Sequence, residues 1–250
     1  THFMPFNKGQ NDGAPYPPFG AGNPVNPTGL KTAYLWEEIL TKRSLANILE
    51  KYVHFEKGIS GNRSKKEALV FPRYHQLDVV RKLLVDSKRK GIGQRFLIQH
   101  SAGSGKSNSI TWLAHQLYGL HDEDNHSIFD CVVVVTDRTV LDRQIRENIK
   151  NFAQVRRVVE AITGNSTDIR NLDPSEQAFS KTAHMRLALE NNKKVIICTV
   201  QTFPFVLEAV HQMQSKRIAF IIDEAHSSQS GTASASMNAL FSGAELPDME

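Results

Sequence analysis

Residues 102–107 read Ala-Gly-Ser-Gly-Lys-Ser, an order of small residues, lysine and hydroxyl that is typical of a phosphate-binding loop. Glycines let the backbone curl until successive N–H groups face a polyphosphate, and the following helix N-terminus adds partial positive charge. Lys106 is then placed to reach the β- and γ-phosphates, and the Ser107 hydroxyl to bind Mg²⁺. His100 stands where the usual eight-residue pattern opens with glycine. The residues predicted to contact the nucleotide here are Ala102, Gly103, Ser104, Gly105, Lys106 and Ser107.

Two adjacent carboxylates, Asp223 and Glu224, directly follow the apolar run 218–222. Such a run is typical of a strand buried on both faces, and ligands of open α/β sheets bind beyond the carboxyl ends of their strands. Asp223 is predicted to hold Mg²⁺, and Glu224 to orient and deprotonate an attacking water. Acidic residues in this place can instead cap the next helix. With the phosphate loop upstream, the pair favours a site for ATP or a close relative of ATP.

The elements that must position these groups alternate between strand and helix from residue 67 onward. We expect strands at 95–99, 131–136, 155–162, 194–200 and 218–222. We expect helices at 76–88, 107–117, 140–152 and 175–190, and a short helix between the last two strands. Strands this apolar that alternate with helices predict an α/β fold, in which helices cover both faces of a mainly parallel sheet.

The N-terminal part of the sequence has a different character. Residues 1–30 hold six of the ten prolines and five of the fifteen glycines, which predicts irregular chain. Helical spacing follows at 33–40 and 44–55, and one apolar face of the second segment contains Leu45, Ile48, Leu49, Tyr52 and Val53. Residues 57–66 read as a basic loop, for which plain solvation is favoured over nucleic-acid contact. We therefore divide the chain into a linker and helical segment at 1–60 and an ATP-binding domain at 61–250.

Composition allows a globular ATP-binding protein and excludes little else. Hydrophobic residues make up 40% of the chain and charged residues 22%, which is ordinary for a globular domain. The net charge of +4 permits a polyanionic partner without requiring one. No apolar run approaches the roughly 20 residues that cross a bilayer, and Cys131 and Cys198 lie in apolar runs. We expect a cytoplasmic protein with core cysteines and no membrane partner, and, because the sequence opens at Thr1, an excised or processed chain.

In this order, the motifs resemble those of superfamily 2 helicases and translocases, and specifically the R (motor) subunit of type I restriction enzymes. The matching strings are residues 3–9, 71–76 (Phe-Pro-Arg-Tyr-His-Gln), 99–107, 136–144, 199–203 and 223–231, the last of which opens with a DEAH box. The resemblance implies a first RecA-like P-loop NTPase domain. It also implies a nuclease domain upstream of this chain and, downstream, a second motor domain that supplies an arginine finger.

The resemblance assigns the residues at 71–76 to the adenine base. Arg73 and Gln76 match the adenine-recognising motif, and the glutamine amide offers a donor and an acceptor that suit the N6 and N7 edge. Phe71 or Tyr74 either stacks on the base or packs the start of the helix. The resemblance further implies that His226 couples the catalytic carboxylate to the DNA-facing motifs.

Two further motifs of the family face DNA. In the first, Arg138 is the favoured phosphate contact, with Thr136 and Arg143 as alternatives. In the second, Thr199, Gln201 and Thr202 carry hydroxyl and amide groups that bond phosphate oxygens without reading sequence. Helix capping is the competing or additional role, because Thr202 stands where an N-cap is expected.

The resemblance implies an ATP- and Mg²⁺-dependent motor that moves along double-stranded DNA, which leads to cleavage by a type I restriction complex. The implied partners are DNA and the methylation and specificity subunits. A general superfamily 2 helicase is the nearest alternative. A nucleotide-regulated binding or scaffold module with little turnover is the alternative from another class. An isolated first motor domain is expected to bind ATP but to hydrolyse it poorly, because its arginine finger lies elsewhere.

Overall fold

The computed structural model describes residues 29–30, 32–57, 67–101, 103–136, 149, 159–162, 181–212 and 216–223. The chain forms two compact units, Thr1–Leu83 with Phe96–Trp112 and Leu84–Arg95 with Leu113–Glu250. The predicted helix at 140–152 lies outside the described residues apart from Ile149, and the predicted basic loop at 57–66 lies outside them apart from Lys57. Among the described residues, no helix combines the length and the apolar character that a bilayer crossing requires.

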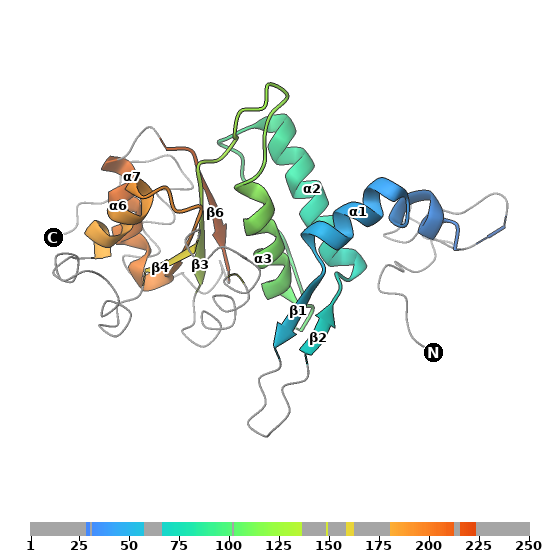
Figure 1. The fold of residues 1–250 in the computed structure, drawn as a ribbon. Helices are drawn as coiled ribbons and strands as arrows, with labels where there is room; N and C mark the ends of the chain where they lie inside the picture. The colour runs from blue at the N-terminus through green and yellow to red at the C-terminus, as the bar shows by residue number, and fades with distance from the viewer. Residues whose placement is uncertain are drawn as a thin grey trace, which may run out of the picture. The chain divides into compact units, whose positions relative to one another are not determined.

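A parallel sheet forms the second unit (Figure 1). Its strands β3 (Cys131–Thr136), β4 (Val159–Ile162), β5 (Val195–Thr199) and β6 (Ile218–Ile222) lie in the order β4-β5-β3-β6. Val133 of β3 is in register with Ile196 of β5 and Phe220 of β6. Parallel neighbours need crossover connections, which is why strands that are adjacent in the sheet are separated along the chain. The predicted α/β fold with a parallel sheet is confirmed.

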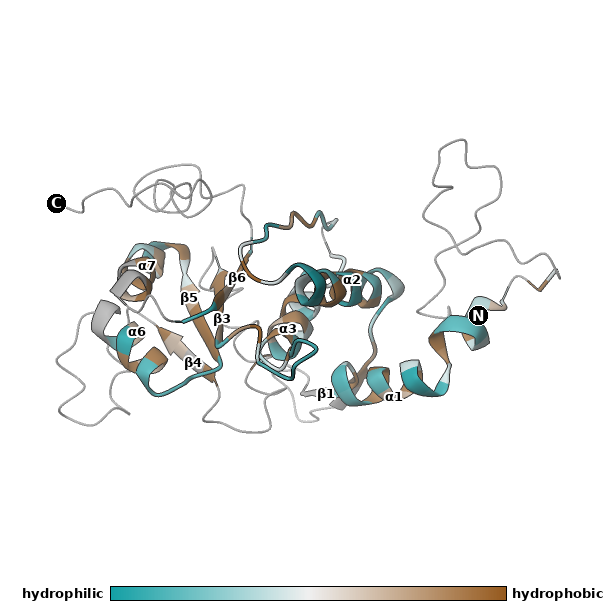
Figure 2. Cartoon of the chain, turned by 90° about the horizontal axis from the view of Figure 1, so that it is seen from above, coloured by the Kyte–Doolittle hydropathy of each residue, from teal (hydrophilic) through white to brown (hydrophobic). Residues whose placement is uncertain are grey.

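The core of this unit explains why its strands are so apolar. Cys131, Val133 and Val135 of β3 face a buried cluster, while Val132 and Val134, on the opposite face, are equally buried. Figure 2 shows β5 and β6 in brown, the colour of hydrophobic residues. The cluster is completed by α6 (Lys181–Glu190) and α7 (Phe203–Gln212), which pack against each other. Both cysteines are free and buried, as predicted, and burial raises the pKa of the Cys131 thiol to about 12.

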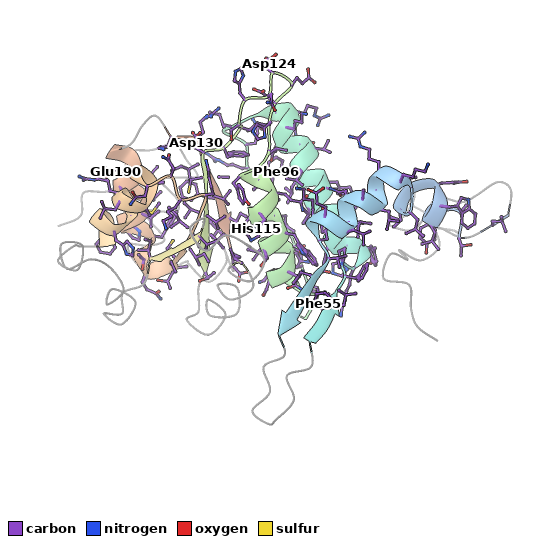
Figure 3. The ribbon with its side chains drawn as sticks, viewed as in Figure 1. Phe55, Phe96, His115, Asp124, Asp130 and Glu190 are labelled. Atoms are coloured by element: carbon purple, nitrogen blue, oxygen red, sulfur yellow. The ribbon has the colours of Figure 1, made fainter. Side chains whose placement is uncertain are left out.

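An ion pair fastens the starts of two neighbouring strands. Asp130, labelled in Figure 3 close to the start of β3, accepts hydrogen bonds from Arg217 Nε at 3.1 Å and Nη2 at 3.0 Å. The same carboxylate accepts the backbone N–H of Arg217 at 2.9 Å, and the Asp130 N–H donates to the Arg217 carbonyl at 2.8 Å. These bonds hold the pKa of Asp130 below its usual range, because they favour the charged form.

The first unit carries the phosphate loop and the elements that support it. It contains the π-helix η1 (Leu35–Ile39), α1 (Lys42–Lys51), the antiparallel pair β1 (His54–Lys57) and β2 (Glu67–Val70), and the beginnings of α2 (Tyr74–Lys90) and α3 (Lys106–Leu117). Thr41 caps α1, because its hydroxyl accepts the Ser44 N–H at 3.4 Å. Arg81 of α2 donates to the Ser44 hydroxyl and to Asn47 Oδ1, both at 3.0 Å, which ties α2 to α1.

Trp112 links the phosphate-loop helix to the N-terminal elements of the same unit. Its fully buried ring lies 5.5 Å from the Tyr52 ring and 6.0 Å from the His54 ring, measured between centroids. Tilted and edge-to-face contacts at these separations are favourable aromatic geometries. The end of α1 and the start of β1 are therefore packed on α3.

Two predictions about local structure are wrong. The helix predicted at 44–55 ends at Lys51, and β1 begins at His54, so the apolar face does not continue to Val53. Ile48 and Tyr52 are buried, but Leu45 and Leu49 are exposed. The strand predicted at 95–99 is absent, and Leu97 is 94% exposed. A strand requires a neighbouring strand with which to pair, and the described residues 95–99 belong to neither sheet.

Candidate nucleotide site

The backbone of the phosphate loop has the shape that anion binding requires. Gly103 and Gly105 have φ values of +71° and +81°, in the left-handed region that side chains rarely allow. Ser104 between them is not among the residues with positive φ. Alternation of hand along consecutive residues is the backbone pattern of an anion-binding nest. The Ser104 N–H itself donates to the Ser101 carbonyl at 3.2 Å. Helix α3 begins at Lys106, so the nest leads directly into a helix N-terminus.

Gln76 fastens this loop to the start of α2. Its Oε1 accepts the Arg73 N–H at 2.8 Å, which is the glutamine half of a capping box. Its Nε2 donates to the carbonyls of Ser104 at 3.3 Å and Gly105 at 2.9 Å. A Cβ atom at Gly105 would collide with this Nε2. The sequence indicated Gln76 as a site residue but did not reveal this contact with the loop.

This geometry counts against adenine recognition by the Gln76 amide. The side chain is 3% exposed, and both its oxygen and its nitrogen already bond to the backbone of the chain. Phe71, at 39% exposure, Arg73 and Tyr74, at 36% exposure, are the exposed members of the predicted adenine motif. Tyr74 contacts the ring of His75 at 5.3 Å between centroids. Base stacking by Phe71 or Tyr74 therefore stays a prediction.

Two histidines that carry no predicted role also contact the loop. His75 Nε2 lies 2.9 Å from the Ser104 carbonyl oxygen, and His100 Nδ1 lies 3.2 Å from the Ser104 hydroxyl. Burial, together with the nearby His75 and Lys106, lowers the pKa of His100. His100 is therefore neutral near pH 7 and leaves the cationic role at the loop to Lys106.

The predicted metal-binding carboxylate lies where the sequence placed it in the sheet unit. Asp223 directly follows β6, is 3% exposed, and donates its N–H to the Val135 carbonyl of β3 at 2.8 Å. This bond continues the pairing of β3 with β6 and fixes the position of the residue at the carboxyl end of the sheet. Glu224 and His226, like Ala102 in the loop, lie outside the described residues.

The structure separates the predicted DNA-facing residues into exposed and buried ones. Thr136 and Thr202 are buried, and Thr202 shares a hydrogen bond of 3.0 Å with the hydroxyl of half-buried Thr199. Gln201 is exposed. Burial counts against direct phosphate contact by Thr136 and Thr202, because a phosphate oxygen must reach the hydroxyl. Arg138 and Arg143 lie outside the described residues.

Comparison with known proteins gives two matches. The chain matches the family of SWI2/SNF2 ATPases over residues 75–246, which is more than half of its 250 residues. It is also 22% identical over 209 residues to a Methanocaldococcus jannaschii protein described as "Putative type I restriction enzyme MjaVIIIP endonuclease subunit". That alignment covers 79% of this chain and 19% of the relative, so the chain spans about one fifth of the relative's length.

Proposed function

Because the chain belongs to the SWI2/SNF2 ATPase family, we propose that it is the ATP-binding motor domain of a type I restriction enzyme subunit. In the longer protein, this domain drives translocation on double-stranded DNA, which leads to cleavage by the complete complex. Methylation and specificity subunits are its proposed partners in that complex. The phosphate loop carries the proposal, since Gly103 and Gly105 give it the backbone of an anion-binding nest before α3.

Each residue of the proposed site has a distinct task. The loop N–H groups and Lys106 bind the β- and γ-phosphates of ATP. The Ser107 hydroxyl and the Asp223 carboxylate are hard oxygen ligands of the kind that Mg²⁺ takes, and bound Mg²⁺ neutralises charge on the phosphates. Glu224 accepts a proton from the attacking water, and His226 couples this step to DNA. That Ser107 and Asp223 act on one nucleotide rests on the family and the order of the motifs.

DNA contact is proposed for the exposed part of the two remaining motifs. Gln201 offers an exposed amide beyond β5, and Arg138 and Arg143 offer guanidinium groups beyond β3. Such groups bind phosphates of any sequence, as a translocating motor requires. Sequence recognition would then belong to another subunit.

The first test removes the lysine of the loop. We expect Lys106→Ala to abolish MgATP binding to the 250-residue chain, measured by calorimetry, because its ammonium group contacts the phosphates. Lys82→Ala is the control, since Lys82 is an exposed lysine on α2 whose partner is Asp78.

Glu224→Gln distinguishes a motor from a binding module with little turnover. In a motor, this variant keeps MgATP binding and loses ATP hydrolysis. Unchanged MgATP binding by Lys106→Ala would refute the proposed site.

A further inference from the structure

Ser104 lies between two imidazoles that hold different atoms of it. His75 contacts its carbonyl oxygen at 2.9 Å and His100 contacts its hydroxyl at 3.2 Å. The two rings also meet each other, with centroids 5.8 Å apart and an interplanar angle of 66°. Both the backbone and the side chain of Ser104 are therefore held by a histidine.

The contact with the carbonyl fixes the chemical state of His75. A carbonyl oxygen only accepts hydrogen bonds, so His75 Nε2 must carry the proton. Two neighbouring rings pack edge-on against the His75 ring, that of Tyr74 at 5.3 Å and that of His100 at 5.8 Å between centroids. The donor is therefore pre-positioned by packing and does not depend on a nucleotide.

Peptide geometry carries this contact into the nest. The Ser104 carbonyl and the Gly105 N–H belong to one planar trans peptide, in which C=O and N–H point in opposite directions. A carbonyl held toward the start of α2 by His75 and Gln76 therefore turns the Gly105 N–H away from α2. The positive φ values of Gly103 and Gly105 are typical of a nest, in which such an N–H faces the concave side of the loop.

We propose that His75 is a positioning residue of the phosphate loop: it holds the Ser104 carbonyl so that the Gly105 N–H faces the phosphates of the bound nucleotide. The inference rests on the proposed ATP-binding function and deepens it. His75 touches neither base nor phosphate in this role. It keeps the loop in its binding conformation before the ligand arrives, which lowers the cost of ordering the loop on binding.

Two variants separate the donor from the ring. His75→Phe keeps an aromatic ring for Tyr74 and His100 but has no N–H, whereas His75→Gln loses the ring and keeps a side-chain N–H of similar reach. The dissociation constants of magnesium ATP and of magnesium tripolyphosphate are measured by calorimetry on the full 250-residue chain. We expect His75→Phe to weaken both about three- to tenfold, the equivalent of one neutral hydrogen bond. We expect His75→Gln to stay within about twofold of the unsubstituted chain.

His121→Phe is the matched control. His121 Nδ1 contacts the Gly119 carbonyl at 2.9 Å on the surface, so the substitution removes a histidine–carbonyl contact outside the loop. We expect it to leave both dissociation constants unchanged, and thermal melting without ligand to show that each variant is folded. Three outcomes would overturn the inference: unchanged binding in His75→Phe, equal losses in His75→Phe and His75→Gln, or a loss confined to ATP, which would indicate contact with the base. If the unsubstituted chain binds neither ligand, the proposed function fails first.

Discussion

At Gly105, both the backbone conformation and the packing of a neighbouring side chain require glycine. Its φ of +81° strains any side chain, and a Cβ atom there would meet Gln76 Nε2. Gly93 has the same φ of +81°, but a Cβ atom there would have no neighbour within 4 Å. The two glycines therefore separate backbone strain from collision with a neighbouring group.

We expect Gly93→Ala to lower the free energy of unfolding by about 1 kcal/mol, through backbone strain alone, and to leave MgATP binding unchanged. Gly105→Ala has the same strain and also displaces the Gln76 amide from the loop, so we expect a larger loss of stability and at least about tenfold weaker MgATP binding. Urea denaturation and calorimetry measure the two quantities. Adding Gln76→Ala to Gly105→Ala removes the collision. If Gly93→Ala and Gly105→Ala had equal effects on MgATP binding, this account would be contradicted.

The elements that sequence reasoning predicted most accurately are the strands buried on both faces. β3 and β6 were predicted with their observed bounds. A short, unbroken run of β-branched or apolar residues between polar residues is compatible with few structures other than a buried strand. The end of α1 was missed for a local reason. Helical spacing of apolar residues continues through Tyr52 and Val53, while β1 begins one residue later through pairing with β2, which lies beyond residue 66.

Non-local pairing also explains the strand that did not form at 95–99. Phe96, Leu97 and Ile98 are apolar but exposed, and whether such a run becomes a strand depends on a neighbour that local pattern does not specify. In the candidate nucleotide site, too, local features could be predicted from the sequence and non-local contacts could not. The spacing of glycines, Lys106 and Asp223 was readable in the sequence, whereas contacts of His75 and Gln76 with the loop depend on how α2 packs.

At the level of elements, the Asp130–Arg217 pair joins the start of β3 to the start of β6. We expect Asp130→Asn to lower the free energy of unfolding at pH 7 by about 1–2 kcal/mol, because the carboxylate accepts three hydrogen bonds from one partly exposed partner. Since the pKa of Asp130 is lowered in the folded state, its contribution is present above the unfolded-state pKa of about 3.9. It is lost as the pH falls through the folded-state value.

Urea denaturation of the two proteins at pH 7 and at about pH 2 measures this dependence, and the difference between them should shrink at the lower pH. Asp86→Asn is the matched control. Asp86 is similarly exposed and pairs with Arg89 and Lys90 on the surface of α2, without a backbone N–H bond. We expect that variant to change stability by less than about 0.5 kcal/mol. A difference for Asp130→Asn that does not vary with pH would show that its charge is not the cause.

At the scale of the whole molecule, the described residues include the phosphate loop and Asp223. The resemblance to superfamily 2 motors implies that the arginine finger lies in a second motor domain. The alignment with the relative from Methanocaldococcus jannaschii covers 19% of that relative. An arginine finger stabilises charge that develops on the phosphates in the transition state. In other nucleotide hydrolases, an arginine finger raises the rate of hydrolysis by about 10³–10⁵-fold.

We therefore expect the 250-residue chain to bind MgATP but to hydrolyse it at least about 10³-fold more slowly than the longer parent protein with double-stranded DNA. Phosphate release, measured with and without DNA for both proteins, checks this expectation. DNA should stimulate the parent and leave the chain nearly unchanged, because coupling to DNA is proposed to pass through both motor domains. Gln201→Ala in the parent should reduce DNA stimulation without reducing MgATP binding, since Gln201 is exposed beyond β5 and is proposed to contact DNA and not the nucleotide. DNA-stimulated hydrolysis by the isolated chain at the parent's rate would show that this domain needs no second one.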